Sequence, residues 1–219
     1  MLLHETPAIA AGVRHLISTV PAFAEADLSR FPWLRRDGDF GGLIRMILGQ
    51  QVSTQAADAM AAKLELLMPS SDPAFFLSLD DQQLKSAGFS RQKMRYGRAL
   101  AETLMTDPDF LARLAELDDH TVIATLTQLP GIGRWSAEIY LMFCLGRPDI
   151  WPIGDLGIVV GAQYLLGADA KPLPAELIAM AEPWRPHRSA ASLLVWHHYG
   201  NVNAARRREQ RKPAKGSAE

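Results

Sequence analysis

Apolar residues recur at helical spacing along almost the whole chain, and short capping sequences separate one run from the next. A period of three to four residues is typical of an amphipathic helix, whereas a half-buried strand alternates at every second residue. The helical runs cover about residues 9–20, 54–68, 91–105, 134–145, 156–166, 173–181 and 189–199. We find no alternating stretch and no internal repeat. The pattern therefore predicts an all-α fold.

Capping residues and prolines mark the expected helix starts. A Ser or Asp side chain can accept a hydrogen bond from the first turn of a helix, and proline suits the first helical position. The expected starts are Ser53, Asp72-Pro73, Ser90, Asp107-Pro108, and Asp118 or Asp119.

Length and composition fit a globular protein. The 219 residues are 48% hydrophobic, which fits one domain or two closely packed lobes. No apolar run approaches the ~18 residues of a membrane-spanning helix. No charged-then-apolar leader precedes a small-residue cleavage site, so a cytoplasmic protein is expected. The single cysteine, Cys144, excludes an intramolecular disulfide, and its apolar neighbours favour a small buried side chain.

A glycine-rich turn lies between two of the predicted helices. Gly131 and Gly133 flank Ile132, and a helical pattern resumes at Arg134. Glycine permits positive φ and lets another backbone approach closely. The N-terminus of the following helix offers N–H groups and the positive end of the helix dipole to a phosphate, and Arg134 can add a charged contact. By itself, however, the turn fits an ordinary helix corner equally well.

A lone carboxylate follows this turn at short range. Asp155 comes after Pro152 and Gly154 and precedes the apolar run 156–166. An isolated Asp in this position is most simply a helix N-cap. A phosphate-binding turn followed by one acid indicates instead a protein that grips a nucleic-acid backbone and performs chemistry beside it.

Together these two features resemble the helix-hairpin-helix DNA glycosylase superfamily. Residues 129–137 (LPGIGRWSA) look like its hairpin, and residues 153–155 look like the end of its Gly/Pro-rich loop, which carries an essential Asp. Residues 48–53, 88–93 and 184–189 resemble further segments. Trp135 and residues 184–189 are similar to the 3-methyladenine DNA glycosylase II (AlkA-like) branch. The resemblance covers roughly residues 35–200.

The resemblance implies two intertwined helical lobes within residues 1–203, in which the N- and C-terminal segments share one lobe. The hairpin, at about residues 127–137, and Asp155 are expected to line the cleft between the lobes. The N-terminal β-domain of some relatives is expected to be absent. Residues 204–219 contain six Lys or Arg and no core-forming apolar residue, which predicts a disordered tail. An auxiliary DNA contact is the alternative for this tail.

The resemblance also assigns the DNA contacts. Asp155 would stabilise positive charge developing on the sugar and orient the attacking water. Gln51 would be the wedge that fills the gap left by an extruded base. The alternative is that Gln50 and Gln51 are solvated residues at a helix start. The expected contacts to the DNA backbone are Gly131, Gly133, Arg134 and Ser136.

Two tryptophans are candidates for the substrate pocket. Trp135 occupies the hairpin position at which strand-cutting relatives carry a lysine nucleophile, so no lyase step is expected. Trp196 matches a pocket tryptophan of the alkylation branch, and an indole ring suits a cationic base. Core packing is the alternative for each. Ile139 occupies the position at which one relative carries an aromatic residue, and Tyr140 follows it. Ile139 and Tyr140 complete the expected pocket.

Cofactor predictions follow from the same comparison. Many hairpins of this superfamily bind a monovalent cation, Na⁺ or K⁺, through backbone carbonyls, and the matching positions here are Thr127, Leu129 and Ile132. An iron–sulfur cluster needs four thiolates, so none is expected. Neither a CxxC nor an HExxH motif accompanies His197-His198, which favours a structural or partly exposed pair over a metal site. Glu138 is expected to form a surface ion pair.

The first hypothesis is a monofunctional DNA glycosylase of base excision repair that releases alkylated bases of the 3-methyladenine and 7-methylguanine type. Its partner would be double-stranded DNA with damaged bases, and we expect a nucleoid-associated monomer without membrane contact. The alternatives are a non-catalytic module that binds distorted DNA, or a glycosylase for hypoxanthine, ethenoadenine or a mismatched base. The net charge of −1 predicts few phosphate contacts and local basic clusters. One such cluster is Arg91, Lys93, Arg95 and Arg98.

Overall fold

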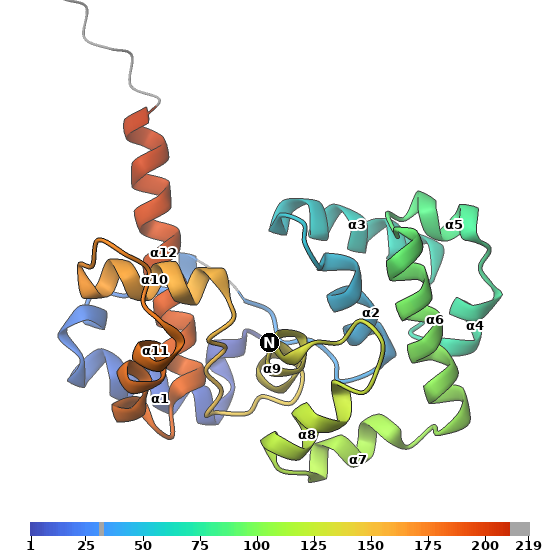
Figure 1. The fold of residues 1–219 in the computed structure, drawn as a ribbon, viewed down its shortest axis with the longest axis horizontal. Coiled ribbons are helices and arrows are strands. Elements are labelled where there is room, and N and C mark those ends of the chain that lie inside the picture. The colour runs from blue at the N-terminus through green and yellow to red at the C-terminus, as the bar shows by residue number, and fades with distance from the viewer. Residues whose placement is uncertain (31–32, 211–219) are drawn as a thin grey trace, which may run out of the picture. The chain divides into compact units, whose positions relative to one another are not determined.

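The computed structural model describes residues 1–30 and 33–210 (Figure 1). These residues form helices and no strand, with one isolated bridge between Leu2 and Leu34, which confirms the predicted all-α fold. The α-helices are α1 (Pro7–Thr19), α2 (Phe40–Gly49), α3 (Thr54–Leu67), α4 (Pro73–Ser78), α5 (Asp81–Ser86), α6 (Arg91–Thr106), α7 (Phe110–Glu116), α8 (Asp119–Leu126), α9 (Arg134–Phe143), α10 (Leu156–Leu166), α11 (Pro174–Ala181) and α12 (Arg188–Gln210). The 3-10 helices are η1 (Leu3–Glu5), η2 (Pro21–Phe23), η3 (Leu28–Arg30) and η4 (Glu182–Trp184).

The chain divides into two compact units. Unit 1 combines Met1–Leu34 with Arg147–Glu219, and unit 2 is Arg35–Gly146. The two terminal segments therefore share one unit, as the resemblance implied. The first helix, α1, lies beside the last helix, α12, in Figure 1.

Unit 1 is built around α12, against which α1 and α10 pack. Glycines allow the close approach of α10, since a Cβ at Gly161 would lie 2.6 Å from Val195 Cγ1. Trp184 packs against the rings of Phe23 and Trp151, each with its centroid 5.5 Å away. These contacts place η2, η4 and the segment before α10 in a common core.

Helix α2 is the buried centre of unit 2. Its buried residues are Phe40, Gly41, Gly42, Leu43, Ile44, Met46, Ile47 and Leu48. Phe76 packs edge-on against Phe40 and Phe89, with ring centroids 5.5 and 5.6 Å apart. Helix α6 approaches this cluster at Gly97, where a Cβ would lie 2.7 Å from Phe76 Cζ. The tightness of this core explains why a glycine stands in the middle of a helix.

Most predicted helix starts are confirmed by their caps. The side chains of Ser53, Asp72, Ser90 and Asp118 each accept a backbone N–H from the first turn of their helix. The start predicted at Asp107-Pro108 is wrong by two residues, because α7 begins at Phe110. The Asp107 carboxylate pairs with Arg113 instead of capping the helix.

The last helix extends beyond the predicted end. Helix α12 continues to Gln210, so the expected disordered tail is helical over residues 204–210. Arg206 accounts for part of this extension, because its guanidinium lies 4.5 Å from the Tyr164 ring centroid and Nη1 donates to the Tyr164 hydroxyl at 2.8 Å. The rest of the predicted tail, residues 211–219, lies outside the described residues.

Candidate functional site

Asp155 is the N-cap of α10, as its position after the Pro/Gly loop predicted. Its Oδ1 accepts the backbone N–H of Ile158 at 3.0 Å and the indole N–H of Trp196 at 2.7 Å. The residue is half-buried, so the carboxylate is not sealed in the core. The capping role does not compete with a chemical role, because the cap fixes the carboxylate at a defined place.

Trp196 contacts the Asp155 carboxylate directly through its indole N–H. Its side chain is half-buried in α12, and its ring centroid lies 6.3 Å from that of Trp33. Gly157 makes room for the indole, since a Cβ there would lie 2.8 Å from Trp196 Cδ1. The predicted use of the indole face as a base pocket stays a prediction, whereas the indole N–H belongs to the Asp155 site.

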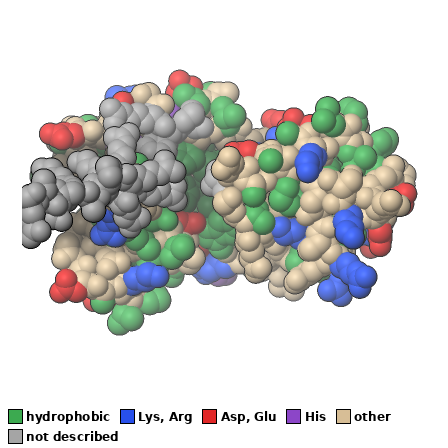
Figure 2. Space-filling model, turned by 90° about the horizontal axis from the view of Figure 1, so that it is seen from above, with side chains coloured by type: hydrophobic (Ala, Val, Ile, Leu, Met, Phe, Trp, Pro, Cys, Tyr) green, Lys and Arg blue, Asp and Glu red, His purple; other side chains and the backbone are tan. Residues whose placement is uncertain are grey.

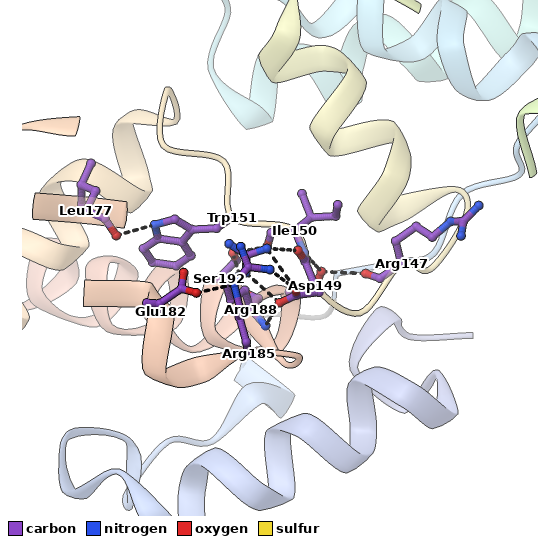
Figure 3. Close-up of polar contacts among 10 residues, drawn as sticks. Arg147, Asp149, Ile150, Trp151, Leu177, Glu182, Arg185, Arg188 and Ser192 are labelled. Carbon is purple, nitrogen blue, oxygen red and sulfur yellow. Dashed lines mark hydrogen bonds and ion pairs between the residues drawn. The ribbon is translucent and has the colours of Figure 1, made fainter. Parts of the chain in front are cut away.

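The loop that ends in Asp155 is held at its beginning by the first residues of α12 and by Arg185 just before that helix (Figure 3). Asp149 accepts from Arg188 Nε at 2.7 Å and Arg188 Nη2 at 2.9 Å, and from Arg185 Nη1 at 2.8 Å. Ser189 Oγ donates to the Arg147 carbonyl and accepts the Ile150 N–H. The Arg188 guanidinium is used within this network. Residues 184–189 thus brace the loop.

The glycine turn has the geometry of a tight hairpin between α8 and α9. Gly131 has φ +84°, and a Cβ on it would lie 2.1 Å from the Tyr96 ring. The buried Ile132 donates its N–H to the Leu129 carbonyl at 3.1 Å. Gly133 is the N-cap of α9, and an added Cβ there would meet nothing within 4 Å. The start of α9 therefore faces open space, as a phosphate-binding turn requires.

Arg134 and Glu138 form an ion pair along α9. Arg134 Nε donates to Glu138 Oε1 at 2.8 Å, and the two side chains are 68% and 4% exposed. The predicted surface ion pair is thus confirmed as a pair, but Glu138 lies inside because α9 is buried on that side. Burial raises the pKa of Glu138, and the Arg134 charge opposes this shift. Arg134 keeps most of its surface in solvent beside the start of α9.

The remaining hairpin residues divide into exposed and buried. Trp135 is 37% exposed, as a residue on the outer side of α9. Ser136 is buried, and its Oγ accepts from Gln50 Nε2 at 3.3 Å; its predicted contact with the DNA backbone stays a prediction. Ile139 is buried. Tyr140 is completely buried and donates its hydroxyl to the Gly38 carbonyl, which corrects its predicted place in the pocket: it serves the core of unit 2.

The predicted wedge stands in the loop between α2 and α3. Gln51 is exposed and has φ +58°, the single positive φ among the described residues other than glycine. Gln50 is half-buried, and its Nε2 donates to the Gly131 carbonyl at 2.8 Å. The alternative of two solvated helix-start residues is therefore wrong for Gln50. The sequence did not predict this contact. It also did not predict that Lys93 binds the carbonyls of Leu48 and Gln50. Both contacts join residues far apart in the chain, so local spacing does not record them.

Candidate metal ligands are few. Residues 1–30 and 33–210 contain no group of three or more His, Cys, Asp or Glu side chains that could hold a metal ion. His197 is buried, and Asn201 Nδ2 lies 3.1 Å from its Nε2, which supports a structural role. The carbonyls of Thr127, Leu129 and Ile132 lie in or beside the hairpin turn. A monovalent cation on them stays a prediction.

Among the described residues on the face shown in Figure 2, Lys and Arg side chains stand apart among neutral and acidic ones and form no broad basic patch outside the grey atoms. Of the predicted basic cluster, Arg98 binds Asp81, and Lys93 binds two carbonyls. Arg91 and Arg95 are exposed. No helix in the described part of the chain is long and apolar enough to cross a membrane.

The sequence matches the HhH-GPD superfamily of base excision DNA repair proteins over residues 44–186. The chain therefore belongs to this superfamily, which confirms the predicted resemblance. The matched range contains the α2–α3 loop, the hairpin and Asp155. Asp155 belongs to unit 1 and the hairpin to unit 2, and their predicted meeting at a cleft stays a prediction.

Individual relatives carry names from the alkylation branch. The chain is 33% identical over 128 residues to the putative DNA-3-methyladenine glycosylase YfjP of Bacillus subtilis, covering 57% of this chain and 43% of that protein. It is 30% identical over 158 residues to DNA-3-methyladenine glycosylase 1 of Schizosaccharomyces pombe, covering 70% and 69%. The chain thus spans less than half the length of the Bacillus relative.

A solved structure of similar fold is the Schizosaccharomyces pombe 3-methyladenine DNA glycosylase Mag1 in complex with abasic DNA. The TM-score is 0.73 at 25% sequence identity, and the similarity covers 85% of this chain and 95% of that chain. The similarity therefore extends over both units and not only over the hairpin.

Proposed function

We propose that this protein is a monofunctional DNA glycosylase of base excision repair that hydrolyses the N-glycosidic bond of alkylated bases in double-stranded DNA. The observation that carries the proposal is the half-buried carboxylate of Asp155, fixed by two N–H donors, in a member of a base excision repair superfamily. The names of the relatives support 3-methyladenine as the type of lesion, and we include 7-methylguanine because it is also a base alkylated at a ring nitrogen.

Asp155 is the proposed catalytic residue. When the bond between C1′ and the base breaks, both electrons leave with the base, and positive charge develops on the deoxyribose. A fixed carboxylate stabilises that charge and can accept the proton of the water that adds to C1′. A base alkylated at a ring nitrogen already carries a positive charge and leaves as a neutral molecule. It therefore needs no general acid, which fits a site with one proposed carboxylate.

The hairpin is the proposed grip on the DNA backbone. The start of α9 faces open space at Gly133, and Arg134 stands exposed beside it. An indole in place of a lysine at Trp135 leaves water as the nucleophile, so the enzyme would cut no strand. Trp135 and Ile139 remain proposed pocket residues. We propose further that the protein works as a cytoplasmic monomer associated with the nucleoid.

The test is release of free base from duplexes that each contain one defined lesion. Asp155→Asn keeps a capping oxygen for Ile158 and Trp196 and removes the negative charge, so folding should be retained. We expect release from 3-methyladenine or 7-methylguanine duplexes to fall by about 10²- to 10³-fold.

Asp80→Asn is the matched control. It makes the same change at the N-cap of α5, where Asp80 Oδ1 accepts the Gln83 N–H, and release should match that of the wild type. Full release by Asp155→Asn would refute the mechanism. Lesion binding without release by the wild type would identify a non-catalytic binding module. Release of only hypoxanthine, ethenoadenine or a mismatched base would reassign the substrate.

A further inference from the structure

Lys93 of α6 binds the end of α2 through two carbonyls. Its Nζ donates to the Leu48 carbonyl at 2.6 Å and to the Gln50 carbonyl at 2.7 Å. The last carbonyls of a helix have no partner within the helix, and a cation at this end also interacts favourably with the helix dipole. Lys93 is half-buried, and desolvation lowers its pKa. Because burial of this ammonium costs free energy of desolvation, surface charge alone does not explain its position.

Gln51 comes directly after the two carbonyls that Lys93 binds. Its φ of +58° lies in the left-handed region, which residues with a side chain rarely adopt. Such a conformation persists only where the surroundings determine it more strongly than the local preference. Lys93 fixes the carbonyl immediately before Gln51, and Ser53 caps α3 two residues after it. Both sides of the strained residue are therefore held.

The same loop is joined to the hairpin. Gln50 Nε2 donates to the Gly131 carbonyl at 2.8 Å and to Ser136 Oγ at 3.3 Å. Tyr96, three residues after Lys93 on α6, packs its ring on Gly131. Helix α6, through Lys93 and Tyr96, and the side-chain amide of Gln50 thus connect the loop that carries Gln51 with the turn before α9. All these residues belong to unit 2.

We propose that Lys93 and Gln50 are positioning residues that hold Gln51 in its left-handed conformation at a fixed place relative to the hairpin turn. This inference rests on the proposed function, in which Gln51 fills the gap in the base stack and the turn grips the backbone. Extruding a nucleotide costs free energy of unstacking, and a wedge recovers part of it only where it stands at the right distance from the gripped phosphate. Lys93 sets that distance without touching DNA.

The experiment is a double-mutant cycle on the full-length chain, with Lys93→Met, Gln51→Ala and both changes together. Lys93→Met should slow single-turnover release of 7-methylguanine from duplex DNA by about tenfold. In the Gln51→Ala background the same change should slow release by less than about twofold, because the wedge that it positions is already gone. Affinity for undamaged duplex should change by less than about threefold, since the grip is left in place.

Lys85→Met is the control for charge, because Lys85 is an exposed lysine of α5 in the same unit. It should release base at the wild-type rate. Gln50→Met is the second variant and keeps the test valid if Lys93→Met lowers the fraction folded. Gln50→Met should show the same dependence on Gln51.

Wild-type release by Lys93→Met, equal slowing with and without Gln51, or a parallel loss of affinity for undamaged duplex would each overturn the positioning role. Failure of the wild type to release any alkylated base would instead refute the proposed function.

Discussion

Gly157→Ala tests whether the Asp155–Trp196 contact controls the candidate site. Gly157 stands in the first turn of α10, next to the residues that hold the carboxylate. A Cβ there would lie 2.8 Å from Trp196 Cδ1, 3.1 Å from Trp196 Nε1 and 3.0 Å from Asp155 Oδ1. Either the indole or the carboxylate must move to admit it.

The sign of the stability change follows from two opposing effects. In a helix without close neighbours, alanine in place of glycine stabilises by about 0.5–1 kcal/mol. Overpacking a filled site costs about 1–3 kcal/mol. We therefore expect a net loss of about 1 kcal/mol, which lowers the Tm by about 2–4 °C in a chain of this size. A displacement of the carboxylate by about 1 Å should slow base release by about 10²-fold.

Thermal unfolding and single-turnover base release measure the two effects on the same preparation. Gly154→Ala is the control for stability, because a Cβ at Gly154 meets nothing within 4 Å. Its free energy of unfolding should stay within about 0.5 kcal/mol of the wild type. A Gly157→Ala protein with a raised Tm and wild-type release would refute the reasoning, since helix propensity alone would then explain the position.

Two further predictions concern buried titratable groups in unit 2. Burial raises the pKa of the Cys144 thiol to about 12, so the native protein should react with a thiol reagent at about pH 8 far more slowly than the protein unfolded in denaturant; equal rates would contradict this. Burial raises the pKa of Glu138 above its unfolded value of about 4.3, so its contribution to stability is present below that pH and is lost as the pH rises through the folded pKa. Glu138→Gln removes this dependence, and its Tm relative to the wild type should rise between about pH 4 and pH 8; a constant or falling difference would show that the Arg134 pair outweighs burial.

Much of the fold was accessible from the sequence because its signals are local. Ser53, Ser90 and Asp118 cap helices within three residues of themselves, so their meaning does not depend on the rest of the chain. The same holds for Gly131, whose positive φ a tight turn between helices demands. The local signal failed at Asp107 because the side chain of Arg113, six residues away, binds the Asp107 carboxylate.

The sequence by itself determined the all-α class, the hairpin, the cap at Asp155 and the superfamily, because helix periodicity, turn chemistry and a short motif all act over a few residues. Tertiary structure alone decided what those residues do with one another. The indole that binds Asp155 comes from 41 residues further along, and the ammonium that holds the α2–α3 loop comes from 43 residues beyond Gln50. The burial of Glu138 and Tyr140 depends on which side of α9 the neighbouring helices cover. Such contacts join elements that are distant in the chain, so no local spacing records them.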